Sequence, residues 1–167
     1  MSLSGDWPDS GTGVTALPMP QDDPIIRAAR EADYAQWLPL WQGYQDFYRV
    51  KLAPAVTEST WKRFFDANEP VRCLVAERDE RLVGLAHYLI HRSTWSVEDI
   101  CYLNDLFVDP RGRRSGVARK LIEAVYRAAD QAGAPKVYWL THESNAAARL
   151  LYDQVAQYGG FIRYTRT

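Results

Sequence analysis

The apolar positions along the chain recur with two different spacings, and these spacings predict where helices and strands form. In some segments apolar and aromatic side chains return at about every third or fourth residue, which is typical of a helix with one buried face. Such helices are predicted over residues 32–48, over a segment that Thr57 would cap and that carries Trp61, Phe64 and Phe65, over a segment marked by Val117, Leu121, Ile122 and Val125, and over residues 145–158. Other segments are short apolar or alternating runs between turn residues, as expected of strands. The predicted strands span residues 24–30, 71–78, 81–92, 99–110, 136–142 and 161–166.

The order of these elements, β-α-α-β-β-β-α-β-α-β, predicts the class of fold. Residues 71–78 and 81–92 are separated by an Asp-Glu turn and should form an antiparallel hairpin. The strands over 99–110 and 136–142 are joined by a helix, which is the connection that two parallel strands need. We therefore expect an α/β protein of the α+β type, with a mixed, mostly antiparallel twisted sheet, helices on both faces and a central β-loop-α-β crossover.

Composition and charge indicate the domain organisation of the chain and exclude some classes of partner. Residues 1–23 are rich in glycine, proline, serine and aspartate without periodicity, so we expect a disordered leader there and a single domain over residues 24–167. Lys and Arg number 20 against 21 Asp and Glu, a formal net charge of −1, which argues against nucleic acid as a partner. No apolar run approaches the ~20 residues that span a bilayer, so no membrane partner is expected. Cys73 and Cys101 form no CxxC pair and indicate free thiols in a reducing compartment, and without a secretion signal the expected location is the cytoplasm.

The stretch DPRGRRSGVARKL, residues 109–121, concentrates positive charge at the start of a predicted helix. It holds four arginines and two glycines directly after a strand, so unpaired amides and the positive end of the helix dipole meet there. Such a point binds phosphate groups. The stretch matches neither GxxxxGK[ST] nor GxGxxG, which excludes a P-loop and disfavours a dinucleotide site.

Within this stretch RRSGVA, residues 113–118, resembles the Q/R-x-x-G-x-G/A acyl-CoA loop of the GNAT acetyltransferases. Its setting is similar too, because it follows the strand YLNDLFVDP and precedes VYWLTHESNAAARLLY, in which Asn145 and Tyr152 stand seven residues apart as in that family. The resemblance implies the GNAT fold over residues 24–167, with acetyl-CoA as co-substrate. It further implies transfer of the acetyl group to a primary amine of a small molecule or peptide by direct attack in a ternary complex.

The resemblance also assigns roles to residues around the crossover. The backbone of Leu106–Val108 would pair with the pantetheine arm like an added strand, where a bulge or splay frees the amides. The backbone from Arg114 to Arg119 would wrap the pyrophosphate, and Tyr152 would protonate the departing thiolate. The cofactor-binding residues implied are Leu106, Phe107, Val108, Arg113, Arg114, Ser115, Gly116, Val117, Ala118, Arg119, Asn145 and Tyr152. From the residues alone, a fully paired core strand, a solvated basic helix start and a core tyrosine stay open as alternatives.

Several carboxylates could act as the general base. Asp105 can accept the proton that an ammonium acceptor loses, and so can Glu98 or Asp99 through a water. In the spermidine/spermine acetyltransferases an acid precedes the Asp, whereas Asn104 stands here, which disfavours both a direct carboxylate base and a polyamine substrate. Asp105 could instead make structural hydrogen bonds within its strand. His142, at the end of a predicted strand, lies near where a substrate could stand.

The remaining features concern partners. No metal is expected, because His87 and His91 stand four apart on one strand face and no third ligand has suitable spacing. The acceptor amine would be bound by the first helix and the loop after it, LWQGYQDFYRVKLAP, which offers Trp41, Tyr44, Asp46 and Tyr48. These side chains are equally suited to a core.

The end of the chain bears on assembly. GNAT folds commonly carry two strands after the last helix, and here only GFIRYTR remains. An open sheet edge favours pairing between subunits, and the ending is similar to that of histone- and D-amino-acid-acetylating members, among which dimers are usual, so we expect a homodimer. A non-catalytic acyl-CoA-binding module is the alternative to an enzyme.

Overall fold

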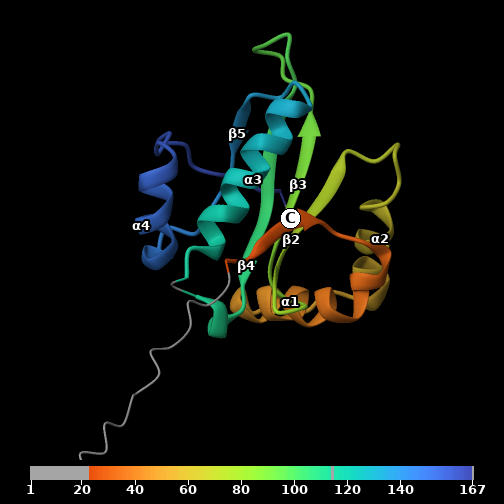
Figure 1. Ribbon diagram of the computed structural model, residues 1–167. Helices are drawn as coiled ribbons and strands as arrows, with labels where there is room; N and C mark the ends of the chain where they lie inside the picture. Colours follow the sequence, from red (N-terminus) through yellow and green to blue (C-terminus); the bar gives the residue numbers. More distant parts are fainter. Residues whose placement is uncertain (1–22, 114, 167) are drawn as a thin grey trace, which may run out of the picture.

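The computed structural model describes residues 23–113 and 115–166 (Figure 1). Within them the strands are β1 (Ile25–Ala28), β2 (Val71–Arg78), β3 (Arg81–His91), β4 (Ile100–Val108) and β5 (Lys136–Tyr138). The helices are α1 (Tyr34–Phe47), α2 (Pro54–Arg63), α3 (Val117–Gln131) and α4 (Ala146–Val155), with 3₁₀ turns η1 (Glu31–Asp33) and η2 (Pro110–Gly112). The predicted leader, apart from Asp23, lies outside the described residues.

The strands form a sheet in the order β1-β2-β3-β4-β5. Strands β1 to β4 pair antiparallel in sequence, and β5 pairs parallel with β4 after the crossover through α3. The hairpin between β2 and β3 turns at Asp79 and Glu80, whose φ angles of 49° and 60° are those of a tight type I′ turn. The expected α+β class, with its mostly antiparallel sheet and one parallel crossover, is confirmed.

Helices cover both faces of this sheet, as Figure 1 shows. Neighbouring residues of a strand point to opposite faces, so Val75 packs with Trp37 and Trp61 under α1 and α2, whereas Ala76 packs with Leu121 under α3. Helices α1, α2 and α3 therefore each bury an apolar face against one side of the sheet. In the part of the chain that the structure describes, no helix is long and apolar enough to cross a membrane.

The start of the second helix differs from the prediction. Helix α2 begins at Pro54 with Ala53 as its N-cap, and Thr57 is buried inside the helix and does not cap it. A proline at the first helical position has its φ angle already set and has no N–H to satisfy, so it starts a helix without a side-chain cap.

The predicted last strand is wrong. Residues 156–166 form no regular element, helix α4 ends at Val155, and Phe161 and Tyr164 are 82% and 88% exposed. Gly160 adopts a positive φ of 73° just before the apolar run, which turns the chain. An alternating pattern makes a strand only where a neighbouring strand offers its backbone, and none in the described residues does so here.

Candidate active site

The site begins where β4 and β5 separate, an opening between the two strands that we call the splay. The two strands pair only from Ile100 with Lys136 to Tyr102 with Tyr138, and the predicted strand over 136–142 stops at that point. Beyond it, β4 continues to Val108 with no partner among the described residues on its β5 side. Leu106–Val108 therefore turn their side chains into the two cores, while the edge of their backbone on the β5 side pairs with no strand among the described residues.

A β-bulge lies in β4 at the same level. His87 of β3 pairs with Asp105, but the next residue, Tyr88, pairs with Leu103, so Asn104 is an extra residue in β4. A bulge bends its strand and redirects the side chains beside it. Here it places Asp105 on the face covered by α1, where it forms the hydrogen bonds described below.

Helix α1 approaches β4 closely at this level. A Cβ atom on Gly43 would lie 2.8 Å from the Cζ atom of Phe107, so only glycine allows the helix to lie this near the strand. The next residue of the helix, Tyr44, is thereby brought to Asp105. The close packing of α1 on β4 thus builds one side of the site.

Asp105 is the buried charge of this site, with 8% of its surface exposed. Its Oδ2 atom lies 2.9 Å from Nδ1 of His87, and Nε2 of His87 lies 3.0 Å from Nε1 of Trp37. Burial raises the pKa of Asp105, but interactions with His87, Asn104 and Tyr44 outweigh it, so the pKa lies below its usual value. The carboxylate is therefore ionised at neutral pH.

Tyrosines surround this carboxylate. Tyr44 stacks on Trp41 with ring centroids 5.4 Å apart. Tyr48 and Tyr102 lie near the carboxylate of Asp105. Burial raises the pKa of each of the three phenols, and the negative charge of Asp105 raises it further. An anionic group set among aromatic rings is a favourable environment for a substrate cation.

Tyr152 lies on the helix that follows β5. Figure 1 shows its helix, α4, set apart from α1 and α2 at the opposite end of the sheet. The ring packs edge-on against Trp139 at 5.3 Å, and burial, with a contribution from Tyr48, raises the pKa of Tyr152 to about 12. Tyr48 is the C-cap residue of α1. The structure therefore brings Tyr48 and Tyr152, from distant parts of the chain, close enough to interact electrostatically.

The loop before α3 exposes backbone amides. Gly116 precedes the helix with φ 77°, no side chain caps α3 among the described residues, and the helix starts at Val117. The first amides of the helix therefore lack internal partners, as phosphate binding requires.

The side chains of this loop are partly engaged. Arg113 lies over the ring of Phe107 and donates to the carbonyl oxygen of Val108, and Ser115 donates to the carbonyl oxygen of Gly112. Ala118 is half-buried, Arg119 donates to Gln154 of α4, and Arg114 lies outside the described residues. Asn145, at the start of α4, donates to the hydroxyl of Thr141.

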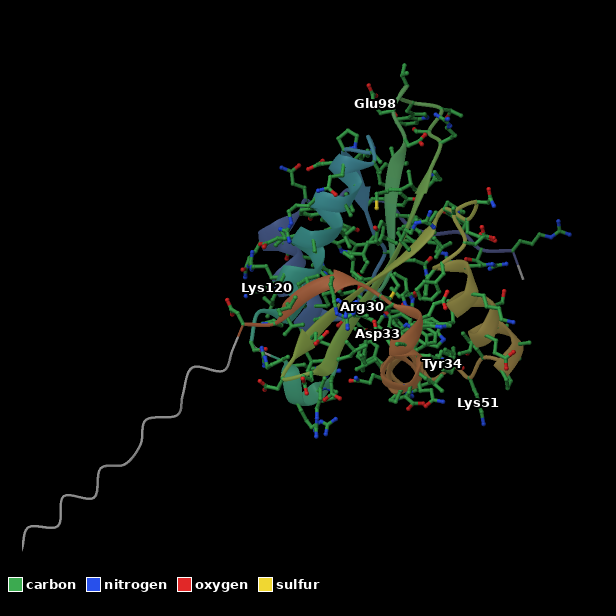
Figure 2. The ribbon with its side chains drawn as sticks, turned by 45° about the vertical axis from the view of Figure 1, so that its right-hand side comes forward. Arg30, Asp33, Tyr34, Lys51, Glu98 and Lys120 are labelled. Atoms are coloured by element: carbon green, nitrogen blue, oxygen red, sulfur yellow. The ribbon has the colours of Figure 1, made fainter. Side chains whose placement is uncertain are left out.

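The other candidate bases lie elsewhere. Figure 2 shows Glu98 at the far tip of the loop between β3 and β4, away from the end of the sheet where Tyr34 and Lys51 lie. Asp99 next to it pairs with Arg92, and at about 3.3 Å per strand residue both acids stand roughly 20 Å along the chain from Asp105. One water cannot bridge that distance, so this expectation is wrong. His142 is exposed and bonded to Ser144, and no cluster of described residues could hold a metal ion.

The pair of His87 and Asp105 was not found by sequence reasoning. It depends on the register between β3 and β4, which the bulge at Asn104 sets. No local sequence pattern predicts that bulge. In the sequence, His87 stands out only together with His91, as a possible pair of metal ligands that their spacing disfavours.

Comparisons with known proteins place this chain in a family. The profile of the Acetyltransferase (GNAT) family matches residues 37–156. The chain is 40% identical over 150 residues to the D-amino-acid N-acetyltransferase HPA3 of Saccharomyces cerevisiae, covering 89% of this chain and 93% of that protein. It is 27% identical to the thialysine N-epsilon-acetyltransferase of Mus musculus, covering 76% of this chain and 79% of that one.

A solved structure shares the fold. The aminoglycoside acetyltransferase AAC(6')-Iy, in complex with the bisubstrate analog CoA-S-monomethyl-acetylneamine, superposes with a TM-score of 0.76 at 18% identity. The match covers 86% of this chain and 97% of that one. The two proteins therefore share their overall fold.

Proposed function

The chain belongs to the GNAT acetyltransferase family and is an acetyl-CoA-dependent N-acetyltransferase, and from this premise we propose that its acceptor is the amino group of a free D-amino acid. The observation that carries the proposal is the buried carboxylate of Asp105 among tyrosines beside the splay. A carboxylate in that position attracts a protonated amine and can take its proton. The relative from Saccharomyces cerevisiae is named for the same class of acceptor.

The charges around Tyr102 match a zwitterion. Burial raises the pKa of Tyr102, the guanidinium of Arg163 lowers it, and the carboxylate of Asp105 raises it, so charges of opposite sign act on one hydroxyl. A free amino acid carries an ammonium and a carboxylate on the same carbon atom. In our proposal Asp105 receives the ammonium and Arg163 the carboxylate, as a charge-assisted pair.

The proposed reaction uses a base and an acid on opposite sides of the thioester. Asp105 takes a proton from the ammonium, the nitrogen attacks the acetyl carbonyl carbon, and the C–S bond breaks. Tyr152, which its raised pKa of about 12 keeps protonated at neutral pH, donates to the departing thiolate. The nitrogen loses two protons in total; one ends on the thiol of CoA and one is released to water.

We propose that acetyl-CoA lies along the splay. The edge of Leu106–Val108 that no described strand covers would pair with the pantetheine arm, and the amides from Arg114 to Arg119 would hold the pyrophosphate. The left-handed turn at Gly116 and the uncapped start of α3 support this placement. The side chain of Arg113 would add positive charge nearby, and Asn145 would contribute from α4.

An acceptor screen tests the function. Thiol release from acetyl-CoA is measured with D-amino acids, their L-enantiomers and polyamines at equal concentrations. We expect the highest kcat/KM for D-amino acids. A preference for polyamines would contradict the proposal.

A pair of variants tests the zwitterion site. Arg163→Leu should raise KM for the amino acid by roughly ten-fold or more, since it removes a hydrogen bond between charged groups. The same variant should leave KM unchanged for the matching amino acid amide, which has no carboxylate. Arg166→Leu, an exposed arginine of the same segment, is the control. Equal effects of the two variants would assign the loss to overall charge.

We also propose that the protein is a homodimer. Phe161, Ile162 and Tyr164 follow one another on the C-terminal segment, all of them largely exposed. An apolar run of this kind gains free energy when a second copy covers it. Sedimentation should show a dimer that becomes a monomer when residues 161–167 are deleted; a monomeric parent at micromolar concentration would refute the proposal.

For location we propose the cytoplasm. Cys73 and Cys101 are both free and buried, as expected in a reducing compartment. Fractionation of the producing cells should recover the protein with cytosolic markers, and recovery from the medium would contradict this.

A further inference from the structure

We propose that His87 is a positioning residue, which fixes the carboxylate of Asp105 toward the acceptor amine, and that Trp37 sets the tautomer that His87 needs. The inference deepens the proposed function and rests on the role of Asp105 in it. It concerns side chains from α1, β3 and β4 that meet in the interior of the protein.

The direction of each hydrogen bond follows from the chemistry of Trp37. An indole N–H is a donor only, so at 3.0 Å it must donate to Nε2 of His87, which therefore carries a lone pair. The ring is then neutral with its proton on Nδ1. That proton points at Oδ2 of Asp105, 2.9 Å away.

The ring of His87 is held in this orientation from several sides. It is 2% exposed, and its centroid lies 5.8 Å from that of Trp37, 5.1 Å from Trp41 and 4.7 Å from Phe64. Turning the ring over would place carbon atoms opposite both the indole and Asp105. Two hydrogen bonds would be lost in the interior, where unsatisfied polar groups are costly.

The consequence for Asp105 is a fixed carboxylate. With Oδ2 bound to His87, the group cannot rotate about its terminal bond without losing that hydrogen bond. The direction of Oδ1 is thereby set before substrate arrives, as preorganised catalysis requires. The same bond favours the ionised form of a carboxylate that burial alone would neutralise.

Two substitutions of His87 separate positioning from packing. The side-chain N–H of an asparagine can stand where Nδ1–H of His87 stands, so His87→Asn keeps a donor for Asp105. His87→Leu fills a similar volume without a donor. We expect His87→Leu to lower kcat for the amino acid by about 10- to 100-fold, the worth of a hydrogen bond to a charged group, and leave the affinity for acetyl-CoA unchanged. His87→Asn should recover most of that loss.

Two tryptophans provide a matched spectroscopic test. Trp37 and Trp41 both pack on His87, but among the described residues Nε1 of Trp41 has no hydrogen-bond partner. Nitrogen NMR of the imidazole should show a proton on Nδ1 and a bare Nε2 in the parent and in Trp41→Phe. In Trp37→Phe, Nε2 should gain a proton in part of the molecules.

The outcomes are distinct. If Nε2 carries the proton in the parent, or if His87→Asn loses as much kcat as His87→Leu, positioning by His87 is overturned. The NMR result decides even if His87→Leu fails to fold. Asp105→Asn tests the underlying function separately: full activity there refutes the role of Asp105, whereas an inactive Asp105→Asn with a fully active His87→Leu refutes only the inference about His87.

Discussion

Replacing Tyr152 by phenylalanine is expected to lower kcat while stability and acetyl-CoA affinity stay nearly unchanged. The ring and its packing against Trp139 remain in the variant. In the proposed mechanism the lost hydroxyl matters only when charge develops on the departing sulfur, so the effect belongs to the transition state.

The size of the loss follows from the pKa of about 12 that burial gives Tyr152. An ordinary thiol has a pKa of about 8.5, so complete proton transfer from Tyr152 to a thiolate is uphill by about 5 kcal/mol. The hydroxyl then acts chiefly by donating a hydrogen bond to the developing charge. General acids contribute about 10²- to 10⁴-fold, and this mismatch places the expected loss near 10².

Tyr126→Phe is the matched control for the assay. Its hydroxyl donates to the carbonyl oxygen of Val155 at 2.9 Å, and its ring lies 6.4 Å from Trp139, on the same aromatic group as Tyr152. Losing that bond should cost about 1 kcal/mol, or a Tm shift of about 2–4 °C, with kcat unchanged. Thiol release, calorimetry with acetyl-CoA and thermal melting are measured on both variants.

Two results would refute the reasoning. An unchanged kcat in Tyr152→Phe would remove this hydroxyl from the mechanism. An equal fall of kcat in Tyr126→Phe would show that the rate responds to packing around Trp139 and not to the hydroxyl of Tyr152.

Three further predictions concern the loop, the acid stability and the helix contact. Gly116→Val and Gly133→Val, at φ 77° and 72°, should each lose about 1–2 kcal/mol of stability, but only the first should weaken acetyl-CoA binding in calorimetry; equal binding would contradict the phosphate loop. A hydrogen bond from the guanidinium of Arg27 lowers the pKa of Asp33 in the folded protein. The ionised carboxylate therefore stabilises the fold fully above its unfolded-state pKa of about 3.9, and this stabilisation is lost as pH falls further. Tm should drop below pH ~4, and a drop just as steep in Asp33→Asn would exclude this group. Gly43→Ala places a methyl group against Phe107 and should cost about 1–3 kcal/mol on chemical denaturation together with much of the activity; an unaffected kcat/KM would show that the site tolerates a shifted α1.

The sequence by itself determined the features that depend on neighbouring residues. Helical and strand spacings predicted the order of elements up to α4, because an amphipathic element needs apolar residues at a regular spacing along the chain. The loop at residues 113–118 and the pair Asn145 and Tyr152 predicted the GNAT family, because backbone approach to a phosphate demands glycine at a helix start. Local signals failed at Thr57, where a preceding proline starts α2, and at residues 161–166, where the strand pattern has no partner.

Only the tertiary structure decided the surroundings of Asp105. Its hydrogen bond to His87 depends on the register of two strands and on an extra residue, Asn104, in one of them. The bond from Trp37 to His87 depends on how α1 docks, which the absence of a Cβ at Gly43 permits. These contacts join residues far apart in the chain, and their geometry is set by packing of whole elements, which no local spacing encodes.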